Sequence, residues 1–368
     1  MMKSSRALFH TCWLLAMTLS AGPQAFAAQN QTVIGVVAPQ SGPYAILGQQ
    51  IEDGARLQAA QSGVKLAFID EPCDNSGTDV APALIKAGAE IAIGFLCSET
   101  LDAALPGLAQ AKIPAITVSV RSSPLMNDAR KNGWPMFRLA PDEQEQPAAI
   151  AQLLLKRWAG KPVALLDDGT ISYRESVNTI RNTLESAGLK PVLIDTFRPA
   201  QEQQRSLVRR LAQVGATNIF IGGDRNDIAI IARDARNAGA DLTIMGGDSM
   251  RAQNEPVALE NGVQAMALPV YAQLPPAKTI AAAAEKANIV VEGYVIPAAA
   301  AVEIAAKTAQ AAKGKPDALT PILANGTFDT AMGKVVFGED SDLNRNSFTL
   351  QQWQNDHFVP VASGKNQQ

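Results

Sequence analysis

EIAIGFLCSETLDAA, residues Glu90 to Ala104, is an apolar run that stops at Cys97-Ser98 and continues at once with helical spacing. The apolar part predicts a buried β-strand, and the part from Glu99 onward predicts a helix. A strand that feeds a helix leaves free backbone N–H groups and the Ser98 hydroxyl at one point, which suits a bound carboxylate. We interpret the rest of the chain around this candidate anion site.

The pattern of a strand followed by a helix recurs along the chain. Short β-branched runs alternate with segments of helical length, which is typical of right-handed βαβ units and a parallel sheet. A first series predicts strands at residues 32–37, 64–70, 90–96, 115–120 and 136–139, with a loop at 121–134. A second series predicts strands at residues 163–166, 191–197, 218–221 and 242–245. We therefore expect two α/β lobes, each a mostly parallel sheet flanked by helices.

The length of the chain also favours two domains. Removal of a predicted signal peptide, residues 1–27, leaves about 340 of the 368 residues, which is more than one core usually holds. The predicted lobes comprise residues 28–139 with 271–328, and residues 140–270 with 329–362. Residues 363–368 are predicted to form a disordered tail.

The N-terminus has the pattern of an export signal. Lys3 and Arg6 precede an apolar region that contains residues 12–17, and Ala25-Phe26-Ala27 matches a small-residue cleavage site. The apolar region is too short to span a bilayer as a permanent anchor. We expect a periplasmic protein that has lost this segment.

The predicted mature chain is acidic. Loss of Lys3 and Arg6 leaves 30 basic against 35 acidic side chains, a net charge of about −5. This balance disfavours nucleic acid as a partner, because a surface that binds nucleic acid needs clustered basic residues.

Two cysteines remain in the predicted mature chain, Cys73 and Cys97. In an oxidising compartment such a pair most simply forms a disulfide. Its contribution would be about 3 kcal/mol by the chain-entropy argument. The alternative is a pair of buried free thiols.

Enzymatic interpretations lack the residues that catalysis needs. His10 lies in the predicted signal peptide and His357 lies near the C-terminus, so little material remains for histidine-based chemistry. The sequence has no G-x-G-x-x-G after the first strand, no G-x-x-x-x-G-K-[ST] and no cluster of histidine and cysteine metal ligands. We predict a binding protein with no catalytic residue, cofactor or metal.

A series of short motifs then resembles a known family. In chain order the motifs are S-G-P-Y-A-x-x-G (41–48), E-P-C-D (71–74), I-G-x-L-C-S (93–98), I-P-A-I-T (113–117), F-R (137–138), G-G-D (222–224), A-R-x-A-G (235–239), M-G-G-D (245–248) and D-T-x-M-G (329–333). Together they are similar to the leucine/isoleucine/valine-binding proteins, over essentially the whole predicted mature chain. The resemblance implies the two-lobed type I periplasmic-binding fold with three hinge crossings, and it implies that Cys73 and Cys97 are joined.

The resemblance assigns the anion site to Ser98, whose hydroxyl and backbone N–H would bind a ligand carboxylate with help from the helix dipole. The alternative is a plain N-cap serine. Ser119 and Arg121 fall where the family offers a backbone carbonyl and a threonine near the ligand's ammonium and carboxylate. Arg121 departs from that pattern. Its guanidinium would clamp an additional acid group, or it is a rim arginine that points to water or pairs with a local carboxylate.

The resemblance assigns the cation site to Asp248, which stands where the family has an acidic residue that binds the ligand's ammonium. The alternative is a solvated aspartate at a strand end. Asp224 occupies a position where leucine-type receptors have an aromatic side chain, and Leu47 replaces a tyrosine. Three tyrosines are further pocket candidates, namely Tyr44, Tyr173 and Tyr294. Tyr173 is the best placed of the three, and for Tyr294 packing in the core is favoured.

These residues predict a more polar pocket than one built for leucine. The function implied by the resemblance is that of a monomeric, extracytoplasmic solute-binding component of an ABC importer, with a small amino-acid-like ligand and a membrane permease as partners. The main alternative is a receptor of the same fold that senses an amide or a small carboxylate and presents ligand state to a partner. An enzyme on this scaffold is a third interpretation.

Overall fold

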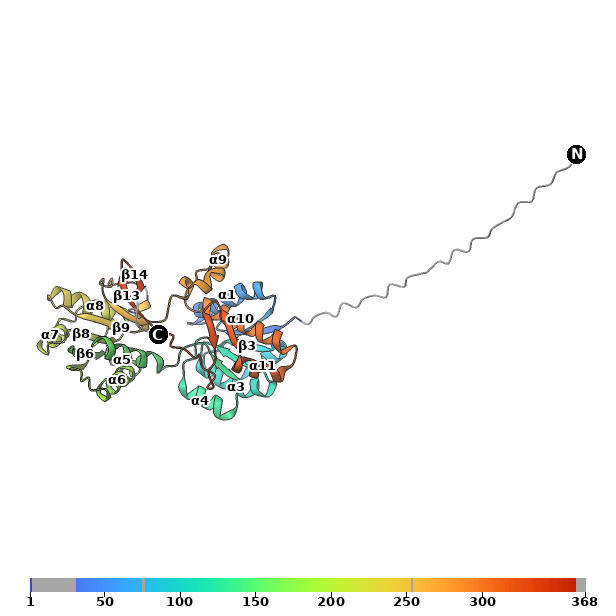
Figure 1. The fold of residues 1–368 in the computed structure, drawn as a ribbon, viewed down its shortest axis with the longest axis horizontal. Coiled ribbons are helices and arrows are strands. Elements are labelled where there is room, and N and C mark those ends of the chain that lie inside the picture. Colours follow the sequence, from blue (N-terminus) through green and yellow to red (C-terminus); the bar gives the residue numbers. More distant parts are fainter. Residues whose placement is uncertain (2–30, 75–76, 253, 362–368) are drawn as a thin grey trace. The chain divides into compact units, whose positions relative to one another are not determined.

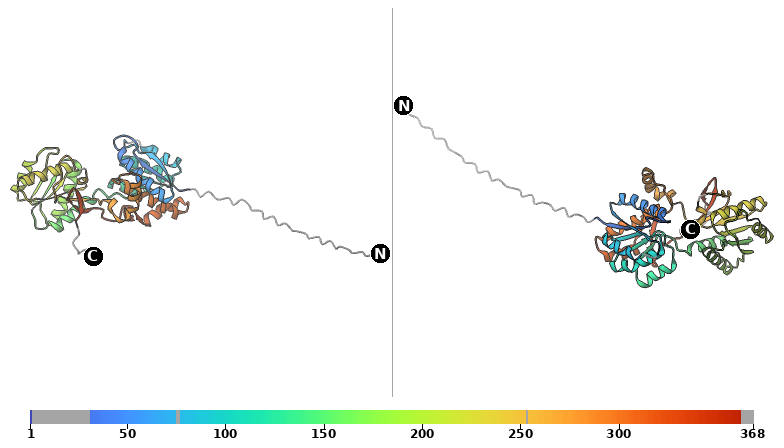
Figure 2. Two further views of the ribbon diagram at one scale, coloured as in Figure 1. Left: turned by 90° about the horizontal axis from the view of Figure 1, so that it is seen from above. Right: turned by 180° about the vertical axis from the view of Figure 1, so that it is seen from behind.

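The computed structural model describes Met1 and residues 31–74, 77–252 and 254–361. The predicted signal peptide, apart from Met1, and the predicted tail 363–368 lie outside the described residues. One compact unit begins at Thr32 and contains two large sheets, each flanked by its own helices (Figures 1 and 2), and a two-stranded hairpin. Among the described residues, no helix is long and apolar enough to cross a membrane.

The first sheet has five parallel strands in the order β2-β1-β3-β4-β5. Their bounds are β1 Val33–Ala38, β2 Lys65–Asp70, β3 Ile91–Gly94, β4 Ala115–Thr117 and β5 Met136–Arg138. Successive side chains of a strand point to opposite faces, so Ile34 and Val36 enter one core and Val37 enters another. The central strands are buried on both faces, as their apolar sequence predicts.

Helices cover both faces of this sheet. One face carries α1 (Ala45–Ser62), α10 (Val295–Ala312) and α11 (Pro316–Asn325), and the other carries α2 (Val80–Lys86), α3 (Ser98–Ala111) and α4 (Ser123–Asn132). Figure 1 shows α1 beside α10. Their close approach needs Gly54, where an added Cβ would lie 2.0 Å from the carbonyl oxygen of Val295. Helices α10 and α11, which lie in the range 271–328 predicted for the first lobe, thus pack on its sheet.

The second sheet has seven strands in the order β14-β13-β10-β9-β8-β6-β7. Only β13 and β14 are antiparallel to their neighbours. The strands are β6 Val163–Asp167, β7 Leu193–Thr196, β8 Asn218–Gly222, β9 Thr243–Gly246, β10 Gln264–Ala267, β13 Thr349–Gln354 and β14 His357–Pro360. The flanking helices are α5 Glu145–Arg157, α6 Ile171–Ser186, α7 Arg205–Gln213 and α8 Arg225–Asn237. The expected second α/β lobe is present.

The predicted loop at residues 121–134 contains a helix, α4. The Ser122 hydroxyl accepts the Leu125 N–H at 3.3 Å, and Pro124 lies in the first turn, where proline is tolerated. Gly133 follows the last turn with φ +67°, as a C-terminal cap. The sequence prediction was wrong because these residues mark the two ends of a helix here, not a loop.

The chain returns toward the second lobe through a hairpin of β11 (Thr327–Thr330) and β12 (Gly333–Val336). The side chains of Val335, Phe337 and Leu343 belong to the core of the first sheet, and the rings of Phe337 and Phe137 lie 5.1 Å apart. The sequence prediction placed residues 329–362 in the second lobe. The packing corrects its first part, because only β13 and β14 join the second sheet; the other boundaries stay predictions.

Arg138 ties two of the chain crossings together. It ends β5, it is 1% exposed, and its Nε and Nη2 donate to the two carboxylate oxygens of Asp342 at 2.6 and 2.7 Å. Nη2 also donates to Asp142 at 2.8 Å, and Nη1 donates to the backbone oxygen of Arg121 at 2.7 Å. A bidentate pair of this kind fixes geometry as well as charge.

We expect Arg138→Met to lower the free energy of unfolding by about 3 kcal/mol, because Asp142 and Asp342 lose the guanidinium that compensates their removal from water. Urea unfolding followed by circular dichroism measures the change. Arg209→Met, on the exposed side of α7, is the matched control and should shift the value by less than about 0.5 kcal/mol. Equal shifts in both variants would contradict the assigned role.

Candidate functional site

The turn between β3 and α3 is held by the carboxylate of Glu71. Its two oxygens accept the backbone N–H groups of Leu96 and Cys97, each at 2.8 Å. Gly94 has φ +105°, and an added Cβ would lie 2.2 Å from the carbonyl oxygen of Val37. Only glycine fits this turn.

The same turn is held by a disulfide. Cys73 and Cys97 are joined, with their Cα atoms 5.6 Å apart, so the predicted disulfide is confirmed and the free-thiol alternative is wrong. Glu71 lies close to both sulfur atoms. Because these sulfurs are bonded to each other, they are not the thiolates that a metal ion would require.

Burial gives Glu71 an unusual acidity. Removal from water raises the pKa of its carboxyl to about 7, although the N–H groups of Leu96 and Cys97 act in the opposite direction. A carboxylate at the base of the candidate anion site therefore titrates near neutral pH.

Ser98 is the first residue of α3 and is half-buried. Its hydroxyl has no hydrogen-bond partner among the described residues, and Cys97 occupies the N-cap position. Ser98 is not among the residues that line the pocket between the lobes, and the role predicted for it stays a prediction.

A pocket of about 700 Å³ lies between the two lobes. Its lining comes from helices α1 and α10 and from the segments that follow strands β4, β5, β9 and β10. The polar side chains among the lining residues are Gln50, Ser119, Arg121, Asp248, Arg251, Tyr271, Glu292 and Tyr294. Three of the predicted site residues, Ser119, Arg121 and Asp248, thus meet in one cavity at the carboxyl ends of β4 and β9.

Ser119 and Tyr294 form one wall of this pocket. Their hydroxyl oxygens lie 2.8 Å apart within one hydrogen bond, and the backbone N–H of Tyr294 donates to the side-chain oxygen of Gln50 at 3.2 Å. Tyr294 also packs against the first core. The interpretation of Tyr294 as a core residue was therefore incomplete, because its phenol end lines the cavity.

Asp248 and Arg121 face each other across the pocket. Arg121 Nη2 lies 3.5 Å from Asp248 Oδ2, and the two side chains are 38% and 30% exposed. The other carboxylate oxygen of Asp248 accepts the Leu268 N–H at 3.0 Å. Arg121 thus lines the pocket and pairs with a carboxylate of the protein itself, as the second interpretation allows; the binding of an acid group of the ligand by Arg121 stays a prediction.

Tyr173 and Asp224 lie on the second lobe but do not line the pocket. The Tyr173 ring packs on Gly222, where an added Cβ would lie 3.1 Å away. Burial raises the pKa of the Tyr173 phenol, a hydrogen bond with Ser249 lowers it, and the carboxylates of Asp224, Asp168 and Asp248 raise it. Tyr173 thus lies within electrostatic reach of both Asp224 and Asp248.

Tyr44 is exposed and occupies the N-cap position of α1, outside the pocket lining. Tyr271, which sequence reasoning missed, does line the pocket, and burial raises its pKa to about 12. No local motif marks Tyr271, because it reaches the pocket only through the path of the crossing that carries it.

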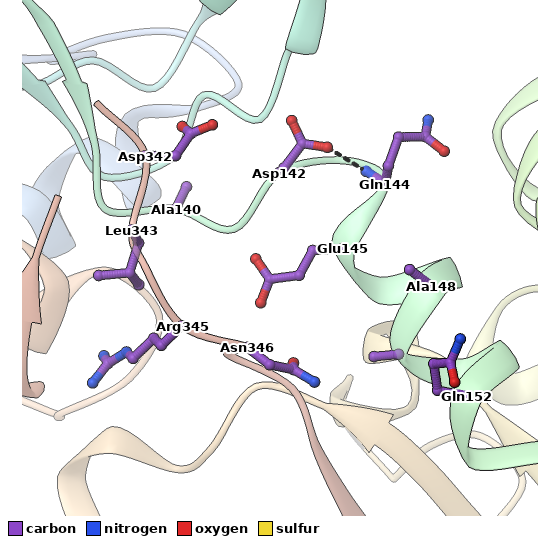
Figure 3. A pocket seen from close by; sticks show the side chains of 11 residues that line it. Ala140, Asp142, Gln144, Glu145, Ala148, Gln152, Asp342, Leu343, Arg345 and Asn346 are labelled. Atoms are coloured by element: carbon purple, nitrogen blue, oxygen red, sulfur yellow. Dashed lines mark hydrogen bonds between the residues drawn. The ribbon is translucent and has the colours of Figure 1, made fainter. Parts of the chain in front are cut away.

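A second cavity, of about 570 Å³, lies beside the crossings. Figure 3 shows the Glu145 side chain pointing from α5 toward the segment that carries Leu343 and Asn346. The Glu145 carboxylate accepts the Ser347 N–H. Because Asp142 and Asp342 of the Arg138 cluster also line it, this cavity belongs to the hinge.

Two α/β lobes with a cavity at the carboxyl ends of strands from both define a two-lobed ligand-binding protein. Residues 31–357 match the family described as "Periplasmic binding protein", and the chain belongs to this family. A leucine-, isoleucine-, valine-, threonine-, and alanine-binding protein of Pseudomonas aeruginosa is 25% identical over 361 residues, which cover 93% of this chain and 95% of that protein. The predicted family and fold class are confirmed.

Solved structures show the same fold. A solute-binding protein of an ABC transporter from Rhodopseudomonas palustris, in complex with 4-hydroxybenzoate, has a TM-score of 0.69 at 18% identity and covers 90% of this chain and 96% of its own. A branched-chain amino acid transporter substrate-binding protein from Streptococcus pneumoniae, in complex with isoleucine, has a TM-score of 0.65 at 18% identity, with coverage of 89% and 97%. These relatives are binding proteins, which supports the non-enzymatic interpretation.

The titration of Glu71 predicts a pH dependence of stability. Its pKa rises from 4.5 to about 7 on folding. Protonated Glu71 therefore stabilises the folded state relative to ionised Glu71, and this contribution is fully present below pH 4.5 and is lost as the pH rises through about 7. The loss amounts to about 3 kcal/mol. Urea unfolding at pH 5 and pH 8 should show most of this fall in the wild type, and Glu71→Gln should lose clearly less stability over the same interval.

The control for this measurement is Glu175→Gln, which changes an exposed carboxyl. It should follow the wild type at both pH values. The assignment fails if Glu71→Gln loses as much stability between pH 5 and pH 8 as the wild type does.

Proposed function

We propose that this chain is the extracytoplasmic solute-binding component of an ABC importer, and that it holds a small amino acid or small carboxylate between its lobes. The observation that carries the proposal is the pocket of about 700 Å³, which draws polar side chains from both lobes. Closure of two lobes around such a site removes the polar ends of a ligand from water.

The binding residues of the proposal are divided between the lobes. Ser98 at the start of α3 receives the ligand carboxylate, and Ser119 with Arg121 borders the middle of the pocket. Asp248, Tyr173 and the more exposed Asp224 contribute from the second lobe. Support comes from the convergence of Ser119, Arg121 and Asp248 on one cavity, and the place of Ser98 at the first turn of α3 suits an anion.

The class of ligand is supported by the relatives. The Pseudomonas aeruginosa relative is named for aliphatic amino acids and threonine, whereas the Rhodopseudomonas palustris structure contains an aromatic carboxylate. A carboxylate is common to both kinds of ligand. We therefore propose a carboxylate-bearing ligand and leave the amino group as the variable to be tested.

The remaining parts of the proposal follow from the importer role. The first 27 residues act as a cleaved signal, the mature chain is a periplasmic monomer, and a membrane permease receives the closed form. The alternative is a sensor of the same fold. Ligand-dependent stimulation of the ATPase of a cognate permease in liposomes supports import, and retained ligand binding without such stimulation supports the sensor.

A thermal-shift screen with amino acids, amides and small carboxylates should identify a stabilising compound. At about 100 times its Kd, a ligand adds roughly 2.7 kcal/mol of stability. For the best compound, Ser98→Ala should weaken binding at least tenfold, as measured by calorimetric titration. The reason is that the charged carboxylate of the ligand loses the hydrogen bond that the Ser98 hydroxyl donates.

Ser206→Ala, in an exposed position of α7, is the matched control and should bind as the wild type does. Wild-type affinity in Ser98→Ala would exclude Ser98 from the site. The absence of a shift with every compound would argue against the proposed function itself.

A further inference from the structure

Asp248 already has protein partners at both carboxylate oxygens. Oδ1 accepts the backbone N–H of Leu268 at 3.0 Å, and Oδ2 lies 3.5 Å from Nη2 of Arg121. In the role taken from the family resemblance, this carboxylate would bind the ammonium of an amino acid. Here the guanidinium of Arg121, from the opposite lobe, occupies that place.

A second guanidinium stands beside the same carboxylate. Arg251 lines the pocket, and its Nη1 donates to the backbone oxygen of Leu268 at 2.9 Å. Burial lowers the pKa of Arg251, and the charge of Asp248 raises it, so the two charges interact. Asp248 therefore interacts with two guanidinium groups, and the carboxylate of Glu145 also interacts with Arg121.

This charge balance discriminates between ligands. An ammonium at Asp248 would have to displace Arg121 and would then lie near two like charges, which disfavours its charged form. A ligand without an ammonium would have to displace neither guanidinium from its partner. Arg121 is held in place, since its backbone oxygen accepts from Arg138 and its guanidinium lies 6.0 Å from the centre of the Phe348 ring.

Other acids near the pocket do not restore a cation site at Asp248. Glu292 lines the pocket, but it is exposed to water and accepts a hydrogen bond from Gln50 at 3.2 Å. Asp224 is exposed and lies outside the lining. Neither is an enclosed carboxylate that awaits a cation.

The remaining lining suits an apolar body. Aliphatic side chains and the ring of Tyr271 surround the charged centre. The aliphatic members include Val118, Leu139, Val270, Ile296 and Met332. A branched or aromatic group would bury its surface against them.

We propose that the ligand is a small apolar carboxylate without an α-ammonium group, and that Arg121 replaces the ammonium as the partner of Asp248. This inference rests on the proposed function and narrows its ligand class. Asp248 acts as a positioning residue, because it orients Arg121 and does not contact a ligand cation.

Calorimetric titration with matched pairs tests the inference. The pairs are L-leucine with 4-methylpentanoate and L-phenylalanine with 3-phenylpropanoate, which differ within each pair only in the α-ammonium. We expect the deaminated member of the better-binding pair to bind at least tenfold more tightly. Equal or tighter binding of the amino acid would overturn the inference and leave the proposed function standing, whereas binding of no small carboxylate or amino acid would overturn both.

Arg121→Thr provides the second arm. This substitution frees Asp248 to bind an ammonium, so the amino acid should bind more tightly and the preference for the deaminated compound should fall at least tenfold. Adding Asp248→Asn to Arg121→Thr should abolish that gain in affinity for the amino acid. Arg209→Thr, in the exposed face of α7, is the control and should keep the wild-type preference. Melting temperatures show whether each variant is folded. An unchanged preference in folded Arg121→Thr would contradict the assigned role of Arg121.

Discussion

A charge that leaves water needs a partner, and this requirement links the scaffold to the site. Arg138, buried at the end of β5, is satisfied by Asp142 and Asp342, which belong to two different crossings. Glu71 accepts two backbone N–H groups of the β3–α3 turn, although burial still raises its pKa to about 7. In each case one side chain holds segments that are distant in the sequence, and for Arg138 the cost of an unpaired buried charge keeps them in place.

The same requirement decides the chemistry of the pocket. Asp248 draws its partner from the other lobe, so the Arg121 contact is both a bridge across the cavity and a determinant of what enters it. The fold supplies the cavity at the carboxyl ends of the strands. The residues at those ends, not the fold, determine whether an amino acid or a simple carboxylate fits best.

The elements of the fold could largely be predicted from the sequence, since alternation of apolar strands and helices is a local pattern. The pairing of Cys73 and Cys97 was accessible as well, because few alternatives exist for two cysteines. The sequence pattern wrongly predicted a loop at residues 121–134, where Pro124 and Gly133 mark the two ends of helix α4. It also could not reveal the second guanidinium at Asp248, because Arg251 is placed by its hydrogen bond to Leu268, which depends on tertiary structure.

The central claim is that Arg121, and not the ligand, supplies the cation for Asp248. The most direct measurement is a crystal structure of the protein with its tightest-binding compound. The account predicts that Arg121 remains paired with Asp248 and that no ligand nitrogen lies within hydrogen-bond distance of that carboxylate. An ammonium bound to Asp248, with Arg121 turned away, would contradict it.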